Sequence, residues 1–406
     1  MPNVRVPVGA DLKRITSRAV AEIVPEVEFL AALRSGRRLR LKMGFDPTRP
    51  VITLGWAVGL RKLRQLQDLG HTVVVIIGDW TAQIGDPSGQ SQTRPMLSAE
   101  EVNTNADAIL GHFYRILDPQ RTEVRRQSEW FDAFTLADVV RLAAGFTIAQ
   151  LLERDDFAQR FGAHRPIGVH ELLYPLLQGY DSIAVESDVE FGGSDQKFNI
   201  LVGRELQGMK GQRPQAAFLV PLLVGLDGKQ KMSQSLGNFI AIDTPPHDMY
   251  GKIMSIPDDV IGQYLELLTD VPDEELEAIR DSLAARAVNP MDVKMRLARE
   301  ITAQFHSANA AQEAEAEFAR VYREGELPDS IVEYALPFSG DSAAADLAAV
   351  LLEAEVVKSR AEVKRLLAQG AIEVDGKKTR DAQAVVHPGT TVRVGKHRWL
   401  RFVAGG

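Results

Sequence analysis

The order of apolar and polar residues in the first part of the chain predicts a strand, a helix and a second strand. Residues 38–43 alternate between polar and apolar side chains, as in a strand that has one covered face. Between Trp56 and Leu69 leucines recur at helical spacing, and Gly70 follows where a helix would end. Residues 71–77 form an almost unbroken β-branched run, which is typical of a strand buried in a parallel sheet. Together these elements predict a βαβ unit.

The turn between the first strand and the helix, residues 43–56, is the first candidate site. Ligands of βαβ units bind at the carboxyl ends of the strands, where the backbone comes close and a helix N-terminus attracts phosphate. Gly44 and Gly55 would permit this approach, and Thr48 and Thr53 offer hydroxyl groups. A nucleotide phosphate site and a purely structural turn are both open interpretations of this segment.

The remaining pattern predicts an α/β fold with a Rossmann-like parallel-sheet domain, an α-helical domain and a small α+β domain. Two further strands are expected at residues 187–191 and 218–224, each followed by glycine, and helical periodicity dominates from Pro245 to about Arg323. The last domain should begin with two helices and end in short strands. The expected divisions are a helical lead-in (1–36), the Rossmann-like domain (37–240) with an inserted helical segment (about 95–170), a helical domain (241–325), a linker (326–340) and a C-terminal domain (341–406).

The composition is ordinary for a globular protein of 406 residues, but the charge is unevenly distributed. Cysteine is absent, which excludes disulfides and thiolate metal sites, and no apolar run approaches the roughly 18 residues of a membrane span. We therefore expect a cytoplasmic protein without a membrane anchor. The chain has a formal net charge of -8, yet from Lys358 onward eleven Lys and Arg face four Asp and Glu. This basic tail indicates RNA or DNA binding, with a merely solvated basic surface as the alternative.

A second candidate site is the loop at residues 229–235, just after the strand expected to end near Gly225. Its two lysines and two serines, among them Lys231 and Ser233, would suit a mobile clamp on phosphates. Ammonium groups in such a loop neutralise the charge that develops on a leaving pyrophosphate. The alternative is an ordinary solvated loop.

A third candidate site lies on one face of a helix, where Tyr174, Gln178 and Asp181 follow one another at i, i+4 and i+7. Leucines flank these residues, so the helix should be largely buried and its polar groups should need partners. A ligand pocket and a polar surface are both open here. Asp86, just beyond the second strand, is either a turn residue or a fixed anion for an amine.

These segments together resemble the class I aminoacyl-tRNA synthetases, and within that family the tyrosine-specific branch. The resemblance extends over nearly the whole chain, and the tail from Ser359 to Gly376 resembles an RNA-binding domain shared with a small-subunit ribosomal protein. The matching motifs are residues 44–48 (GFDPT), 85–89 (GDPSG), 174–181 (YPLLQGYD), 192–196 (GGSDQ) and 231–235 (KMSQS).

The resemblance implies an enzyme that activates tyrosine with ATP and Mg2+, passes it to tRNA(Tyr), and forms a homodimer through the inserted segment. It implies no protein-bound metal. Asp86, Tyr174 and Gln178 would hold the amino group of tyrosine, Asp181 its phenolic hydroxyl and Gln196 its carboxyl end. The implied sets are catalytic (Lys231, Ser233, Thr48, Thr53), ATP-binding (Gly44, Asp46, Gly55, Gly193, Asp195, Met232), substrate-binding (Thr81, Asp86, Tyr174, Gln178, Asp181, Gln196) and RNA-binding (Lys358, Ser359, Arg360, Lys364, Arg365, Lys377, Arg380).

The chain departs from the family pattern at the phosphate end. The family's HIGH motif has two histidines that bind ATP phosphates, and here Thr53 and Trp56 replace them. The second lysine of the KMSKS loop is Gln234, and Lys42 stands where a tyrosine is often found. Loss of one transition-state donor typically costs about a hundredfold to a thousandfold in rate. These changes predict weakened or altered activation chemistry beside an intact tyrosine end.

Three functions follow from this combination. The first is a tyrosine-specific tRNA ligase. The second is a non-charging paralogue that binds tyrosine, or an analogue, and RNA. The third is a nucleotidyl transferase of the same fold that acts on another small acid, and the intact set of Tyr174, Gln178 and Asp181 speaks against it.

Overall fold

The structure is a computed structural model, and it describes residues 4–88, 96–321, 331–338, 340–357, 359–395 and 398–405. The chain divides into two units. One contains the residues up to 244 together with residues 255–301, and the other contains residues 245–254 and the residues from 302 onward. Among the described residues, no helix is both long and apolar enough to cross a membrane.

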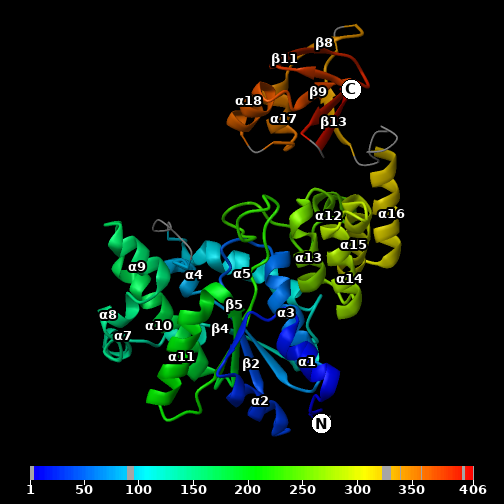
Figure 1. Ribbon diagram of the computed structural model, residues 1–406. Coiled ribbons are helices and arrows are strands. Elements are labelled where there is room, and N and C mark those ends of the chain that lie inside the picture. The colour runs from blue at the N-terminus through cyan, green and yellow to red at the C-terminus, as the bar shows by residue number, and fades with distance from the viewer. Residues whose placement is uncertain are drawn as a thin grey trace. The chain divides into compact units, whose positions relative to one another are not determined.

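The first unit is built on a six-stranded sheet with the strand order β1-β6-β5-β2-β3-β4 (Figure 1). Neighbouring strands are parallel except for β1, which is antiparallel to β6. The chain runs from β2 outward to β3 and β4 on one side, and later places β5 and β6 on the other side. The order therefore reverses between β2 and β5, which is where ligands bind in open α/β sheets. The strands are β1 (Glu22–Val24), β2 (Arg40–Phe45), β3 (Thr72–Ile77), β4 (Thr122–Arg126), β5 (Val189–Gly193) and β6 (Ala216–Val220).

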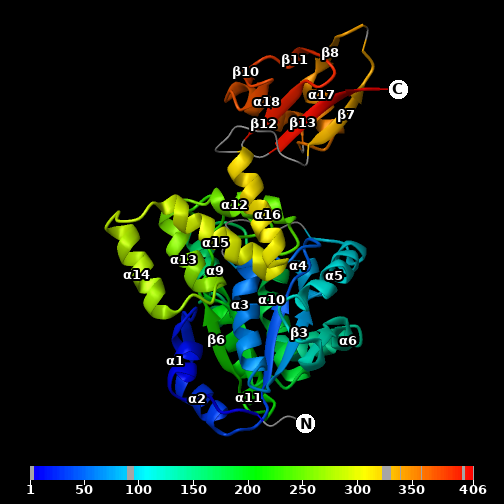
Figure 2. The ribbon, with the colours of Figure 1, turned by 90° about the vertical axis from the view of Figure 1, so that its right-hand side faces the viewer.

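The hydrophobic pattern that predicted the βαβ unit also locates its core. Residues 73–77 of β3 are fully buried, and α3 (Leu54–Gln67) buries Leu60, Leu63 and Leu66. Figure 2 shows α3 crossing the middle of the sheet. The helices α10 (Val169–Ala184) and α11 (Lys197–Met209) pack against each other on the other side of the sheet (Figure 1). The predicted strand, helix and strand are therefore confirmed.

The N-terminal lead-in is only partly helical, contrary to the sequence prediction. It contains α1 (Gly9–Ser17) and α2 (Glu26–Arg34), but β1 lies between them and pairs with β6 at the edge of the sheet. Three residues are too few for a strand to show an alternating pattern, so the prediction had no signal to use.

The inserted segment expected at about 95–170 also contains a strand of the main sheet. β4 pairs with β3, although its sequence TEVRR has a single apolar residue and gave no strand signal. The other elements around it are helical, as expected. They are α4 (Thr81–Ile84), α5 (Ala99–Phe113), η1 (Pro119–Arg121), α6 (Ser128–Phe131), α7 (Leu136–Ala143), α8 (Ile148–Leu151) and α9 (Asp155–Gly162).

The helical pattern after Pro245 is confirmed, and the last strand of the sheet is shifted relative to the prediction. β6 covers residues 216–220 rather than 218–224, because Pro221 cannot donate to the ladder. The short helix η2 (Ser194–Gln196) precedes α11. The later helices are α12 (Pro246–Met254), η3 (Asp258–Val260), α13 (Ile261–Leu268), α14 (Asp273–Ala284), α15 (Pro290–Phe305) and α16 (Ala308–Ala319).

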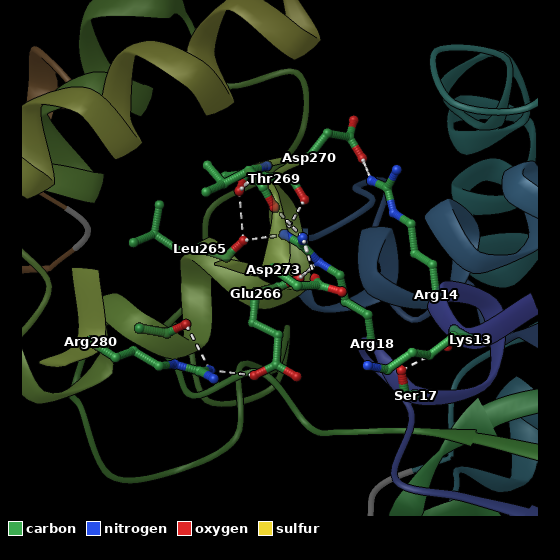
Figure 3. A network of polar contacts seen from close by, with 12 residues as sticks. Lys13, Arg14, Ser17, Arg18, Leu265, Glu266, Thr269, Asp270, Asp273 and Arg280 are labelled. Atoms are coloured by element: carbon green, nitrogen blue, oxygen red, sulfur yellow. Dashed lines mark hydrogen bonds and ion pairs between the residues drawn. The ribbon is translucent and has the colours of Figure 1, made fainter. Parts of the chain in front are cut away.

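Within the first unit, Arg18 fastens the lead-in to α13 and α14 (Figure 3). This guanidinium group is almost fully buried, donates to several backbone carbonyl oxygens of residues 265–271, and pairs with Asp273 at 3.0 Å. Arg14 beside it pairs with Asp270 at 2.7 Å. A cation at the carbonyl end of a helix satisfies acceptors that the helix itself leaves unpaired. The lead-in therefore holds α13 and α14 on the Rossmann-like part of the unit.

The second unit contains a small α+β domain with a five-stranded sheet in the order β10-β9-β12-β13-β7 and a two-stranded sheet of β11 and β8. The two predicted helices are present as α17 (Leu347–Glu353) and α18 (Arg360–Ala368). Residues 332–336, placed by the sequence in a linker, instead form β7, which pairs in parallel with β13. Pro328 and Pro337 had suggested a linker because they flank this short strand. The strands are β7 (Val332–Leu336), β8 (Ala343–Asp346), β9 (Ile372–Val374), β10 (Lys377–Thr379), β11 (Gln383–Val386), β12 (Thr391–Val394) and β13 (Arg398–Ala404).

Candidate active site

A cavity of about 210 Å³ opens at the carboxyl ends of β2, β3, β5 and β6, at the point where the strand order reverses. It gathers residues that are up to about 190 positions apart in the sequence. Every residue that the sequence proposed for catalysis, ATP or amino-acid binding lines this cavity. The set is Gly44, Asp46, Thr48, Thr53, Gly55, Thr81, Asp86, Tyr174, Gln178, Asp181, Gly193, Asp195, Gln196, Lys231, Met232 and Ser233.

The opening turn is held in place by the segment that follows the KMSQS loop. Thr53 forms an isolated antiparallel bridge with Ala241, and the backbone N-H of Leu54 donates to the carbonyl of Ile240 at 2.9 Å. The Thr53 hydroxyl oxygen accepts from the backbone N-H of Trp56 and so caps α3. Trp56 turns its ring onto Phe45, with centroids 5.0 Å apart. The two positions that replace the histidines therefore have a helix cap and an aromatic contact in the local fold.

Gln234 joins the KMSQS loop to the opening turn. Its Nε2 donates to the carbonyl of Val51 at 2.6 Å, and its Oε1 accepts from the Thr48 hydroxyl at 2.8 Å. Gln234 is 6% exposed, so these bonds are shielded from water. The sequence treated Gln234 only as a missing positive charge. In the structure it is also a neutral connection between two phosphate-end segments.

Lys231 forms an ion pair with Asp195 across the same end of the cavity. Both side chains are partly exposed and line the cavity, and Lys231 belongs to the expected catalytic set and Asp195 to the expected ATP-binding set. The loop around Lys231 is itself ordered by Asp227, which accepts from two backbone N-H groups at 2.8 Å and from Asn238 at 2.7 Å. The backbone N-H groups of Lys229 and Gln230 hold the pKa of this carboxyl group below its usual range. An ATP ribose at Asp195 would have to replace its contact with Lys231.

Asp46 connects the end of β2 to both neighbouring elements. One of its carboxylate oxygens accepts from the Tyr174 hydroxyl at 2.9 Å, and the other accepts from the Thr81 hydroxyl at 2.7 Å. Burial and the nearby Asp46 raise the pKa of Tyr174 well above its usual value, so Tyr174 stays a neutral phenol. Gly78 makes room for this arrangement, because a Cβ there would overlap Asp46 and Thr81.

Asp181 is a buried carboxylic acid with one oxygen that has no partner. Its Oδ2 accepts from Gln127 Nε2 at 2.9 Å, whereas Oδ1 has no hydrogen-bond partner among the described residues. Burial raises the pKa of Asp181 to about 7, Lys42 opposes the rise, and Glu190 adds to it. Asp181 therefore brings to the cavity lining one carboxyl oxygen that has no partner among the described residues.

Lys42 and Glu190 form a fully buried ion pair, 3.1 Å apart and at most 1% exposed. The ammonium group of Lys42 also donates to the Gln178 carbonyl at 2.9 Å and to the Ser182 hydroxyl at 2.8 Å. Glu190 accepts from Gln178, Ser182 and Gln215. A buried pair is stable only when its remaining donors and acceptors are satisfied, and here they are. Lys42 is not among the described residues that line the cavity, and it supports the lining through its contact with Gln178.

Asp86 has the turn role that the sequence left open, whereas its role as a fixed anion for an amine stays a prediction. Its Oδ1 accepts from the backbone N-H of Ser88 at 2.8 Å, as a turn residue does, and its carboxylate also lines the cavity. Burial would raise the pKa of Asp86, but Arg154 and Ser88 outweigh it and hold that pKa below its usual value. Gln196 Nε2 donates to Asp86 at 2.8 Å and to the Ser88 hydroxyl at 3.1 Å. Both Gln196 hydrogens are thus engaged beside Asp86, and the contact of Gln196 with the carboxyl end of a substrate stays a prediction.

Four residues in or beside this site were not predicted from the sequence. Gln127 follows β4, the strand that gave no signal, and Glu190 lies inside β5. Arg154 is 4% exposed and donates to Asp156, Asn199 and Asp86. Asn199 lies in the first turn of α11. Only Gln127 had a usable signal, because it would fall at the carboxyl edge of the sheet once β4 is recognised.

The proposed RNA-binding residues lie in the second unit. Ser359 caps α18 by accepting from the backbone N-H of Glu362 at 3.2 Å. The others that the structure describes are solvent-exposed, as a nucleic-acid surface requires, and Lys358 lies outside the described residues. The exposed basic side chains are Arg360, Lys364, Arg365, Lys377 and Arg380.

The raised pKa of Asp181 predicts a pH dependence of stability. Its pKa rises from 3.8 to about 7 on folding, so between these values the folded chain holds a proton that the unfolded chain releases. This group therefore makes the free energy of unfolding fall as pH rises from 3.8 to 7, with no further loss above. Asp181→Asn should remove this part of the slope. Denaturant titrations at pH 5, 6, 7 and 8 measure it, and a variant whose difference from the parent is the same at every pH would contradict it.

Comparison with known proteins gives the family. The family model described as tRNA synthetases class I (W and Y) matches residues 34–323, and the S4 domain model matches residues 347–392. The tyrosine-tRNA ligase of Dehalococcoides mccartyi is 53% identical over 392 residues, covering 97% of this chain and 98% of that protein. The tyrosine-tRNA ligase of Thermotoga maritima is 48% identical over 394 residues, covering 97% of each.

Solved structures agree on the fold. The crystal structure of tyrosyl-tRNA synthetase from Archaeoglobus fulgidus, complexed with L-tyrosine, has a TM-score of 0.61 at 24% identity and covers 75% of this chain and 98% of that chain. A C-terminally truncated mitochondrial tyrosyl-tRNA synthetase of Aspergillus nidulans has a TM-score of 0.62 at 20% identity, covering 77% and 93%. The chain therefore belongs to the class I tRNA synthetases (W and Y) and contains an S4 domain, and within that family it is similar to the tyrosine-tRNA ligases.

Proposed function

We propose that this chain activates tyrosine with ATP and transfers it to tRNA(Tyr). The observation that carries the proposal is the single cavity at the strand-order reversal. It joins a buried carboxylate with an unpartnered oxygen, Asp181, to a lysine-bearing loop at residues 231–235. The high identity to tyrosine-tRNA ligases over the full chain supports the same function.

The amino-acid end has groups that match tyrosine. Asp181 Oδ1 would accept the phenolic hydroxyl, and above the Asp181 pKa of about 7 this bond would be charge-assisted and so stronger than a neutral one. Asp86, Tyr174 and Gln178 would hold the ammonium group, since the Tyr174 hydroxyl donates to Asp46 and keeps its lone pairs for an N-H donor. Phenylalanine would leave the Asp181 oxygen unpaired, and such loss of a partner is the known basis of discrimination in this enzyme type.

The ATP end would bind the nucleotide as its Mg2+ complex. Asp195 would receive the ribose, and Lys231, released from Asp195, would turn to the phosphates. Thr53 uses its oxygen to cap α3 and keeps its O-H for a phosphate oxygen. Ser233 would add a hydroxyl donor, and Thr48 would add a second one only by releasing its hydrogen bond to Gln234. Gly44, Gly55, Gly193, Asp46 and Met232 would form the wall against which the nucleotide packs.

The reaction would need positioning and charge stabilisation rather than a protein acid or base. The tyrosine carboxylate attacks the α-phosphorus of ATP, pyrophosphate leaves, and the terminal ribose of tRNA then takes the tyrosyl group from the adenylate. In this chain Lys231 is the cation nearest to such a leaving group in the described cavity lining. Loss of the two histidines makes its contribution larger.

A second function is favoured by the same phosphate end. Thr53, Trp56 and Gln234 replace three groups that carry or donate charge in the family, and Gln234 ties the loop to the opening turn. A non-charging paralogue that binds tyrosine and RNA would tolerate all three changes. Tyrosine binding by calorimetry without any tyrosine-dependent exchange of pyrophosphate into ATP would select this second function.

Lys231→Ala tests the proposed ligase. We expect pyrophosphate exchange to slow by about a hundredfold to a thousandfold, because a preorganised charge at the transition state is lost. Tyrosine binding should be retained. Lys229→Ala is the matched control, since Lys229 is in the same loop, is exposed and does not line the described cavity. Equal rates for the two variants would argue against a phosphate role for Lys231.

RNA binding is the proposed task of the S4 domain. The double variant Arg360→Ala/Lys364→Ala on α18 should weaken tRNA binding and flatten the plot of log affinity against log salt by about one to two units, because each phosphate contact contributes about 0.7 to 0.9. Arg5→Ala, an exposed basic residue far along the sequence, serves as control. A salt slope that is unchanged in the double variant would exclude these residues from the RNA surface.

We also propose that the protein forms a homodimer through the inserted helices. Its proposed location is the cytoplasm, where charged tRNA is used. Large apolar side chains lie exposed on this segment, including Leu136 at 79% and Val169 at 77%. Leu136→Glu should shift the protein to monomers in sedimentation, because a charge would be buried at the interface. Val27→Glu is the control at equal exposure, 79%, outside the segment. A dimer that survives the first change, or is lost in the second, would locate the interface elsewhere.

A further inference from the structure

Asn199 lies behind the cavity at the junction of its polar groups. It is 1% exposed and is not among the described residues that line the cavity. Its Oδ1 accepts from Arg154 Nη1 at 3.0 Å, and its Nδ2 donates to Gln178 Oε1 and to Gln196 Oε1, each at 3.0 Å. Every polar atom of the Asn199 side chain is thus engaged, and both glutamines that it contacts do line the cavity.

The orientation of these three amides follows from groups that have only one hydrogen-bonding role. Arginine can only donate, so Arg154 must face the oxygen of Asn199, and the Asn199 NH2 group then faces the two glutamines. Carboxylates can only accept, so Glu190 faces Gln178 Nε2 at 3.1 Å and Asp86 faces Gln196 Nε2 at 2.8 Å. The two constraints agree, since each glutamine then presents its oxygen to Asn199.

This orientation determines what the glutamines offer to a substrate. The Nε2 hydrogens of Gln196 are used by Asp86 and Ser88, whereas each glutamine Oε1 has a second lone pair beyond its bond to Asn199. The donors around Asp86 are already engaged, and the sites that remain on the two glutamine oxygens are acceptors. An α-ammonium group, with three N-H donors, is the part of an amino acid that matches them.

We propose that Asn199 is a positioning residue that fixes Gln178 and Gln196 as acceptors for the ammonium group of the amino-acid substrate. The inference rests on the proposed tyrosine activation and adds to it. Gln196 joins the ammonium site instead of the carboxyl end, and a residue that does not touch the substrate sets the polarity of that site. Asn199 is buried and the two glutamines are partly buried, and each of the three amides is held by a charged partner, so this orientation is costly to reverse.

Asn199→Asp tests the proposal with almost no change of volume. Aspartate can still accept from Arg154, but it cannot donate, so both glutamines must turn their NH2 groups toward it. Their oxygens would then face Glu190 and Asp86. We expect KM for tyrosine to rise about tenfold or more, the scale of one hydrogen bond to a charged group, while KM for ATP stays the same.

Asn199→Ala separates orientation from packing. Alanine removes the donor but imposes no reversed orientation, so its effect on KM for tyrosine should be smaller than that of Asn199→Asp. A packing role predicts the opposite order, because alanine leaves a cavity and aspartate does not. A purely electrostatic role predicts a lower KM for Asn199→Asp, since an added carboxylate would attract the ammonium group. Either of these results would overturn the proposal.

Gln207→Glu is the matched control on the same helix. Gln207 is also 1% exposed, donates to the carbonyls of Ser182 and Ser187, and accepts from the backbone N-H of Gln215. It should lower the melting temperature as an amide-to-carboxylate change in the core, yet leave KM for tyrosine unchanged. An equal rise of KM in this control would reduce the role of Asn199 to general stability.

Calorimetric titration with tyrosine keeps this inference distinct from the proposed function. If the parent chain binds tyrosine but shows no pyrophosphate exchange, the ligase proposal fails, and the order of Kd among the Asn199 variants still decides the inference. If exchange is present and all variants share one Kd and one KM, the inference fails and the ligase stands. If the parent does not bind tyrosine at all, both fail.

Discussion

The need to pair buried charges shapes the network that supports the lining of the cavity. Lys42 and Glu190 are almost fully buried, and so is Arg154, which contacts Asp86 and Asp156. A charge in such surroundings is tolerated only with a partner of opposite sign and with its remaining hydrogen bonds made. These contacts connect α10, α11, β2 and β5, because the partners come from all four elements.

The sheet topology determines where this network can form. The strand order reverses between β2 and β5, so the segments after these strands diverge and leave a crevice at the carboxyl edge. Asp46 follows β2, Thr81 follows β3, Gln127 follows β4 and Gln196 follows β5. Asp46 and Gln127 come directly after their strands, whereas Thr81 lies in α4 and Gln196 in η2, so all four are near the carboxyl edge of the sheet. Asp181 and Tyr174 complete the set from one face of α10.

The two ends of the cavity differ in how firmly they are built. Around Asp181, the polar atoms are bound into a buried network, and Asp181 Oδ1 is without a partner among the described residues. Around the loop at residues 231–235, the Lys231–Asp195 pair is partly exposed, while Gln234 links the loop to Val51 and Thr48 with neutral bonds. One end of the cavity is thus a buried network, and the other carries an ion pair that solvent reaches.

The sequence by itself determined the strand, helix and strand of the first βαβ unit, because periodicity and the β-branched run at residues 71–77 depend only on local preference and burial. It also located the lining residues through motifs. Only the tertiary structure decided that β1, β4 and β7 join sheets, because short or polar strands gain their stability from neighbours distant in the sequence. The roles of Lys42, Gln127 and Asn199 were decided there too, since a hydrogen bond between positions far apart leaves no trace in either local sequence.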